Sequence, residues 1–219
     1  MLTATSGKVF YDGLEELNRI REQLAYYPHD IWLYLLSAQW RRIEQEEPFM
    51  GRCGDVGDEL GSQVIAARLV RDVMKLCFLM ERRYATYMKW FGTAFARLRC
   101  ADELTPLLQH ALRASGWKER EALFSLIYER LAEMHNALGI TQPLETKVSP
   151  FYTRPYMVIH AERFAEAIRN VISDEEVKHI KVMIGGVDQF VDSTDVLSEP
   201  KILTRMCQGT FGEVSTYIH

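Results

Sequence analysis

The stretch VGDELGSQVIAARLVRDVMKLCFLMERR, residues 56–83, decides the fold of this chain. It contains no proline, and its last glycine is Gly61, so a helix can continue through it without a break. At about 100° of rotation per residue, its apolar side chains cover more than half of the helix circumference, which predicts a mostly buried central helix. This apolar face consists of Leu60, Val64, Ile65, Ala66, Ala67, Leu69, Val70, Val73, Met74, Leu76, Cys77, Phe78 and Met80.

The remaining arc of the central helix, named here the basic stripe, is narrow and highly charged. A charged arc of this kind is typical of a solvent-exposed helix face. The alternative is a wall that binds a triphosphate or docks an acidic partner, because the planar guanidinium group suits both roles. The basic stripe consists of Arg68, Arg71, Asp72, Lys75 and Arg82.

The composition indicates one globular domain. The chain has 219 residues, of which 47% are hydrophobic and 26% are charged. Its net charge of −4 provides no general attraction to DNA or anionic lipid. Four scattered cysteines without C-x-x-C spacing predict no zinc site and no disulfide. With no signal peptide and no apolar run of about 18 residues, we expect a cytoplasmic protein that binds neither DNA nor membranes.

Helical periodicity continues on both sides of the central helix. The sequence therefore predicts an all-α bundle of about seven to nine helices over residues 13–219. Besides the central helix, the expected segments are roughly residues 14–27, 30–47, 84–98, 107–114, 117–138, 162–172, a segment capped at Ser173-Asp174, and 199–207.

Residues 1–12 differ from the rest of the chain. Lys8 to Asp12 is strand-like and ends at the turn signal Asp12-Gly13. A single strand is unstable without a sheet. We therefore expect this segment either to pack on the helices or to be the remnant strand or linker of a missing domain.

The second predicted helix places polar side chains within its apolar arc. Arg42 and Glu46 are four residues apart, so they can form an ion pair that Gln39 completes. Buried charges are costly unless they are paired, which favours a structural pair. The alternative is a polar wall facing a cleft, where Glu46 is a weak candidate for a general base acting on a substrate hydroxyl.

Three further segments contain candidate binding residues. In the aromatic segment 84–98, Lys89 beside Trp90 pairs a cation with a stacking surface, although such aromatics more often fill a core. Gly51, Gly54 and Gly57 precede the central helix and could present N–H groups to an anion, but lack the lysine and serine of a phosphate-binding loop. An acidic turn could bind a divalent ion, although a capped turn fits its spacing better. The turn consists of Asp188, Gln189, Asp192, Ser193 and Asp195, of which Asp188, Gln189 and Asp192 are the candidate binding residues.

His135 lies in the middle of the apolar face of the predicted helix 117–138. A buried structural histidine is the usual meaning of such a position. Arg130 and His135 also form the R-x4-H spacing of helical HEPN ribonucleases, whose bundles often accompany nucleotidyltransferases. Arg154 and His160 nearly repeat that spacing, which shows how often it arises by chance.

Several segments together resemble the domain-of-unknown-function 4037 family: GKVFYDG at residues 7–13, residues 24–95, MHNALG at 134–139 and VDQFVDSTDVL at 187–197. The resemblance covers nearly the whole chain. It implies a bacterial protein in which a nucleotidyltransferase-like head precedes a helical region. Wider relatives are similar to aminoglycoside nucleotidyltransferases, in which a helical domain helps to hold the acceptor substrate.

The catalytic pattern of such a head is missing from this chain. A head of that class needs a G-S turn followed by a D-x-D pair that holds two metal ions. Here Gly61-Ser62 lies inside the predicted central helix, and no D-x-D occurs. We therefore expect no metal or cofactor in this chain. Mg²⁺ and a nucleoside triphosphate are implied only for a head domain, present in cis or in trans.

These observations predict a helical substrate-binding and head-docking domain that is inactive in nucleotide transfer on its own. Gln39, Arg42 and Glu46, together with Lys89 and Trp90, are expected to face a cleft for a small-molecule acceptor. Arg68 and Arg71 are expected to meet phosphate or the head. The alternatives are a HEPN-like ribonuclease built on Arg130 and His135, usually as a homodimer, and a helical interaction module without a ligand.

Overall fold

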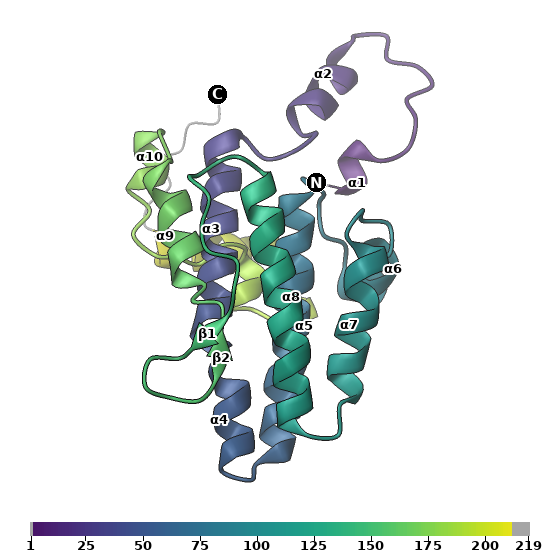
Figure 1. Cartoon of the computed structure of the whole chain (residues 1–219). Helices are drawn as coiled ribbons and strands as arrows, with labels where there is room; N and C mark the ends of the chain where they lie inside the picture. The colour runs from purple at the N-terminus through teal and green to yellow at the C-terminus, as the bar shows by residue number, and fades with distance from the viewer. Residues whose placement is uncertain (1, 212–219) are drawn as a thin grey trace.

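The computed structural model describes the chain from residue 2 to residue 211 (Figure 1). The last eight positions of the predicted helical domain 13–219 therefore lie outside the described residues. Helices dominate, and the described part of the chain contains a single two-stranded sheet, which confirms the predicted all-α class. Eight of the described helices have seven residues or more, within the expected seven to nine. These are α2, α3, α4, α5, α7, α8, α9 and α12.

Three long helices form the centre of the bundle. α3 (His29–Glu46) packs against α5 (Glu59–Met80) and α9 (Glu162–Asn170), and α8 (Trp117–Ala137) packs against α5 and α7 (Ala101–Arg113). Trp32 and Trp40 of α3 are almost completely buried, as are Leu69 and Leu76 of α5 and Phe124 of α8. The predicted central helix is therefore confirmed as the core of the fold.

The central helix begins later than residue 56, because the chain turns between two helices. α4 (Phe49–Asp55) precedes the turn, where Gly57 has a φ of 82° that suits glycine. Asp58 then caps α5 by accepting a hydrogen bond from the Gly61 N–H at 2.8 Å. The glycines before the turn lie within α4 rather than in an open anion-binding loop. A Cβ on Gly54 would lie 2.1 Å from Cγ of Trp117, so this glycine permits close helix packing.

The first turns of α5 are more exposed than the predicted apolar face. Leu60 and Val64 are 73% and 53% exposed, while Ser62 and Ala66 on the opposite side are fully buried. α4 and α8 pack against α5. The guanidinium group of Arg120 in α8 donates a hydrogen bond to the hydroxyl oxygen of the buried Ser62 at 2.8 Å. The helix buries only one side at this end, so the wide apolar arc does not continue along its whole length.

The N-terminal residues 2–23, named here the N-terminal arm, extend away from the bundle (Figure 1). They form α1 (Leu2–Thr5) and α2 (Glu16–Gln23), and α2 contains no buried residue. The expected strand-like segment Lys8 to Asp12 is irregular, because no strand of the described chain pairs with it. The Arg21 guanidinium holds the arm together by donating to the carbonyl oxygens of Ser6 and Gly7 at 3.0 Å.

The bounds of several remaining elements differ from the prediction. The segment expected as a helix over 84–98 contains only η1 (Met88–Trp90) and α6 (Phe91–Phe95). α7 begins at Ala101 rather than at the predicted residue 107, and the last described helix continues to Phe211 rather than ending at residue 207. Asp174 caps α10 (Glu175–Lys178) as the sequence predicted. The other elements are the antiparallel strands β1 (Ser149–Pro150) and β2 (Met157–Val158), η2 (Val187–Gln189), α11 (Thr194–Leu197) and α12 (Pro200–Phe211).

Candidate functional site

The structure joins two predicted faces into one charged site, named here the polar cluster. The inward polar side chains of α3 meet the basic stripe of α5 where the two helices pack together. Ion pairs and hydrogen bonds connect the α3 residues Gln39, Arg42 and Glu46 with the α5 residues Arg68 and Asp72. These five residues were candidates on separate segments of the sequence, and the fold brings all of them together.

Glu46 and Asp72 are the anionic centres of the polar cluster. Arg42 forms an ion pair with Glu46 at 2.7 Å, and its Nε lies 3.7 Å from Oδ2 of Asp72. Arg68 contacts the same Oε1 of Glu46. The Gln39 amide donates to the backbone carbonyl of Asp72 at 3.0 Å. Because two guanidinium groups share one oxygen of Glu46, this carboxylate is better suited to pairing than to abstracting a proton.

Burial makes this pairing important for the fold. Glu46 is 5% exposed and Asp72 is 1% exposed. Burial raises the pKa of Asp72, while the neighbouring Arg42 and Arg71 act in the opposite direction. An unpaired charge at this depth would be strongly unfavourable. The polar cluster therefore joins α3 to α5 as a structural network, in agreement with the predicted ion pair.

A segment from the far end of the chain contacts two further residues of the basic stripe, Arg71 and Lys75. Residues 185–192, named here the C-terminal turn, place Asp188 2.6 Å from Lys75 and Asp192 3.9 Å from Arg71. The Gln189 amide donates to Oε1 of Gln39 at 3.1 Å. The predicted acidic turn thus forms ion pairs and hydrogen bonds with the stripe and extends the polar cluster to three segments of the chain.

Tyr34 anchors the segment that leads into the C-terminal turn. Its hydroxyl lies within hydrogen-bond distance of the backbone carbonyls of Val182 and Ile184. No pattern in the sequence indicated a role for this tyrosine. Its bond to Val182 spans 148 positions, so no local spacing along the sequence indicates the contact.

A small cavity of about 100 Å³ lies beneath the C-terminal turn. Its walls combine the apolar side chains Tyr27, Leu35 and Phe78 with the cations Lys75 and Arg83. Asp188 and Gln189 of the turn line one side of it and also contact the polar cluster. The partly open cavity therefore combines apolar and charged walls.

The other predicted site residues are placed elsewhere. Lys89 lies over the ring of Trp90 at 5.4 Å in η1, and Trp90 is 58% exposed. Neither side chain lines the cavity beneath the C-terminal turn. Arg82 is separated from the stripe, because its guanidinium lies 4.0 Å from the ring centroid of Trp32.

The structure does not bring Arg130 and His135 into one site. His135 is fully buried against Phe164, bonds Thr141 at 3.0 Å, and has its pKa lowered to about 4 by burial. Arg130 is partly exposed and pairs with Glu103 at 2.6 Å. The two residues therefore point to different environments, and His135 is the buried structural histidine that its position on the helix predicts.

Neither a metal-ligand cluster nor a membrane-spanning helix is found among the described residues. Within residues 2–211, no group of three or more His, Cys, Asp or Glu side chains is placed to hold a metal ion. In the same part of the chain, the helices are too short or too polar to cross a bilayer.

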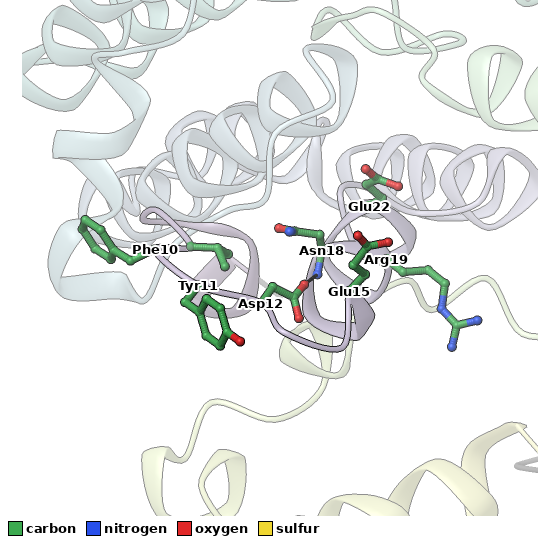
Figure 2. A pocket seen from close by; sticks show the side chains of 8 residues that line it. Phe10, Tyr11, Asp12, Glu15, Asn18, Arg19 and Glu22 are labelled. Carbon is green, nitrogen blue, oxygen red and sulfur yellow. Dashed lines mark hydrogen bonds between the residues drawn. The ribbon is translucent and has the colours of Figure 1, made fainter.

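The N-terminal arm contains an open concavity of about 610 Å³ (Figure 2). Figure 2 shows that the labelled side chains around it all come from one local stretch, between Phe10 and Glu22. Within the arm, the Asp12 carboxylate accepts a hydrogen bond from the Asn18 N–H at 2.8 Å. Phe10 and Tyr11 are 95% and 88% exposed. This concavity has no wall from the bundle, so it is a less suitable ligand site than the cavity beneath the C-terminal turn.

Comparison with known families gives one match. The model described as "Domain of unknown function (DUF4037)" matches residues 1–91, which include the N-terminal arm, α3 and α5. This supports the resemblance for that part of the chain. The segments MHNALG and VDQFVDSTDVL, which contributed to the resemblance, lie outside the match. Searches of curated proteins and of solved structures found no significant match.

Proposed function

We propose that this chain is a helical substrate-binding and head-docking domain of a nucleotidyltransferase-like protein. The polar cluster is the observation that carries the proposal, because it brings most of the predicted site residues together where α3, α5 and the C-terminal turn meet. The family match over residues 1–91 supports the resemblance from which the nucleotidyltransferase context is inferred, and that context is itself part of the proposal. The sequence lacks a D-x-D metal pair, so the proposal assigns nucleotide transfer to a head domain.

In this function the polar cluster and the N-terminal arm have different roles. Arg68 and Arg71 meet a phosphate group of the substrate, because arginine suits phosphate recognition. The N-terminal arm docks the head through Phe10, Tyr11 and Leu14, which are 95%, 88% and 80% exposed. Large apolar side chains gathered on one exposed segment indicate a contact surface. The head, in cis or in trans, would contribute Mg²⁺ and the nucleoside triphosphate.

Two measurements test this function. The purified chain, incubated with Mg²⁺ and each nucleoside triphosphate, is expected to release no pyrophosphate. A nucleotidyltransferase-like head from a protein matching the same family model is expected to co-elute with the chain in gel filtration. Phe10→Ser with Leu14→Ser should abolish co-elution, whereas Tyr152→Ser, at a residue 75% exposed in the hairpin loop, should leave it unchanged. Robust nucleotide transfer by the chain alone would contradict the proposal.

A second candidate function is a helical interaction module without a ligand. It is favoured by the internal pairing of the basic stripe, because Arg68, Arg71 and Lys75 all contact carboxylates of the chain itself. A chain that binds a head but no phosphate-bearing molecule would support this candidate over the first.

A further inference from the structure

The charges of the polar cluster balance only when the C-terminal turn is in place. Arg42, Arg68, Arg71 and Lys75 contribute four positive charges, and the buried Glu46 and Asp72 contribute two negative ones. The α3 and α5 face alone therefore has a net charge of about +2. Two carboxylates of the C-terminal turn neutralise this charge. Asp188 pairs with Lys75, and Asp192 pairs with Arg71.

The two kinds of carboxylate differ in how firmly the fold holds them. The side chains of Glu46 and Asp72 are 6% and 2% exposed, so their ion pairs belong to the interior. Those of Asp188 and Asp192 are 50% and 88% exposed. The side chains of their cation partners Lys75 and Arg71 are 11% and 26% exposed with the turn in place, so the hydrated partner of each pair is the carboxylate. A competing anion can therefore replace these hydrated carboxylates more easily than the buried Glu46 and Asp72.

The geometry points to a binding site for a phosphate monoester, which the C-terminal turn covers when no ligand is bound. We propose that Asp188 and Asp192 occupy the positions that the phosphate oxygens take in the bound state. A phosphate monoester carries about two negative charges at neutral pH, which equals the charge that the two carboxylates contribute. Arg71, Lys75 and the partly exposed Arg68 are the groups that would hold it.

The cavity beneath the turn indicates what is attached to the phosphate. Tyr27, Leu35 and Phe78 form apolar walls next to Lys75. The cavity is partly open and has a volume of about 100 Å³, so with the turn in place it holds a small group or part of an aromatic ring. The ligand class is therefore a monoester with a small apolar or aromatic group. This inference deepens the proposed function and rests on its assignment of a phosphate to Arg68 and Arg71.

Isothermal titration of the full chain with phenyl phosphate tests the inference. The double variant Asp188→Asn with Asp192→Asn is expected to bind at least tenfold more tightly than the unmodified chain, because the competing carboxylates are gone. Phenyl sulfate has the same shape but only one negative charge, so the double variant should improve its affinity less than it improves that of phenyl phosphate. Asp195→Asn is the matched control, since Asp195 is an exposed acidic residue of the same region and pairs with none of these cations. It should bind like the unmodified chain.

Adding Lys75→Gln and Arg71→Gln to the double variant should abolish the gained affinity. Unfolding midpoints of all variants, measured in urea, verify that each chain remains folded. The inference is overturned if the folded double variant binds phenyl phosphate no better than the unmodified chain, or if the gain survives loss of both cations. Neither outcome affects head co-elution, so failure of this inference and failure of the proposed function can be distinguished.

Discussion

At the scale of single residues, Arg42 is the cation that connects the two buried carboxylates. Its guanidinium group pairs with Glu46 at 2.7 Å and approaches Asp72 at 3.7 Å. The spacing of Arg42 and Glu46 along one helix predicted the first contact. The contact with Asp72 joins two helices, so it depends on how they pack and has no local signature in the sequence.

Arg42→Met should destabilise the protein by roughly 3 kcal/mol, because it removes the closest cation from Asp72 while the carboxylate stays buried. The neighbouring Arg41→Met provides the control. Arg41 pairs with Glu44 at 2.8 Å, but its side chain is 44% exposed, so the loss should be below about 1 kcal/mol. Urea unfolding measures both free energies. Equal losses for the two variants would show that the polar cluster does not stabilise the fold.

Glu47, beside the polar cluster in sequence, makes stability depend on pH. Its carboxylate accepts N–H groups of Ile159 and Ala161 at 2.8 and 3.0 Å, but burial raises its pKa from 4.5 to about 8. The folded chain therefore keeps a proton that the unfolded chain loses above pH 4.5. The stabilisation is fully present below the unfolded pKa and is lost as the pH rises to about 8.

The free energy of unfolding should therefore fall by about 2 kcal/mol between pH 6.5 and 8. His135 does not interfere in this window. Its pKa falls from 6.5 to about 4 on burial, so its own stabilisation is lost only as the pH decreases below 6.5. Urea unfolding at several pH values measures the slope, and Glu47→Gln should flatten it. A slope that remains in this variant would assign the pH dependence to another group.

At the scale of elements, glycines decide how closely α4 approaches α8. The sequence showed Gly51, Gly54 and Gly57 at a regular spacing but not their purpose. Gly57 ends the turn with a positive φ, while Gly54 faces the ring of Trp117 across the helix interface. The partner ring is distant in sequence, so the pattern alone could not distinguish packing glycines from an anion-binding loop.

Gly54→Ala should destabilise the protein by about 1–3 kcal/mol, because the added Cβ would lie 2.1 Å from Cγ of Trp117. Alanine favours a helix over glycine, so a gain in stability is the result expected from propensity alone. Gly92→Ala in α6 is the control, since an added Cβ there would have no heavy atom within 4 Å other than its chain neighbours and the backbone of its own helix. It should be neutral or stabilising in thermal unfolding. Equal effects of the two substitutions would contradict this account of α4.

The periodicity of apolar residues predicted the positions of the long helices better than it predicted which of their faces are covered. It identified α3, α5 and α8 because their buried faces repeat with the helical period. It overestimated the apolar face of α5, since Leu60 and Val64 are exposed where no helix covers them. It also predicted a helix in the aromatic segment 84–98, where the chain forms only η1 and α6.

At the scale of the whole molecule, the chain joins an exposed N-terminal arm and a helical bundle (Figure 1), and its C-terminal turn returns to the surface of α3 and α5. The sequence indicated that residues 1–12 differ from the rest, but an isolated segment without a partner remains irregular rather than extended. The sequence pattern indicated three candidate residues in the C-terminal turn. In the fold, Asp188 pairs with Lys75, Gln189 bonds to Gln39 and Asp192 pairs with Arg71. Contacts between such distant segments depend on tertiary packing, which local patterns do not record.

If the polar face of α3 and α5 binds an anion in place of the C-terminal turn, ligand binding must release the turn. Hydrogen–deuterium exchange of residues 182–192, with and without saturating phenyl phosphate, measures this release. We expect faster exchange of these amides in the bound chain, because the ligand displaces Asp188 and Asp192 while α3 and α5 remain protected. Slower or unchanged exchange of the turn at saturation would show that the ligand binds without replacing it and would disprove the proposed anion site.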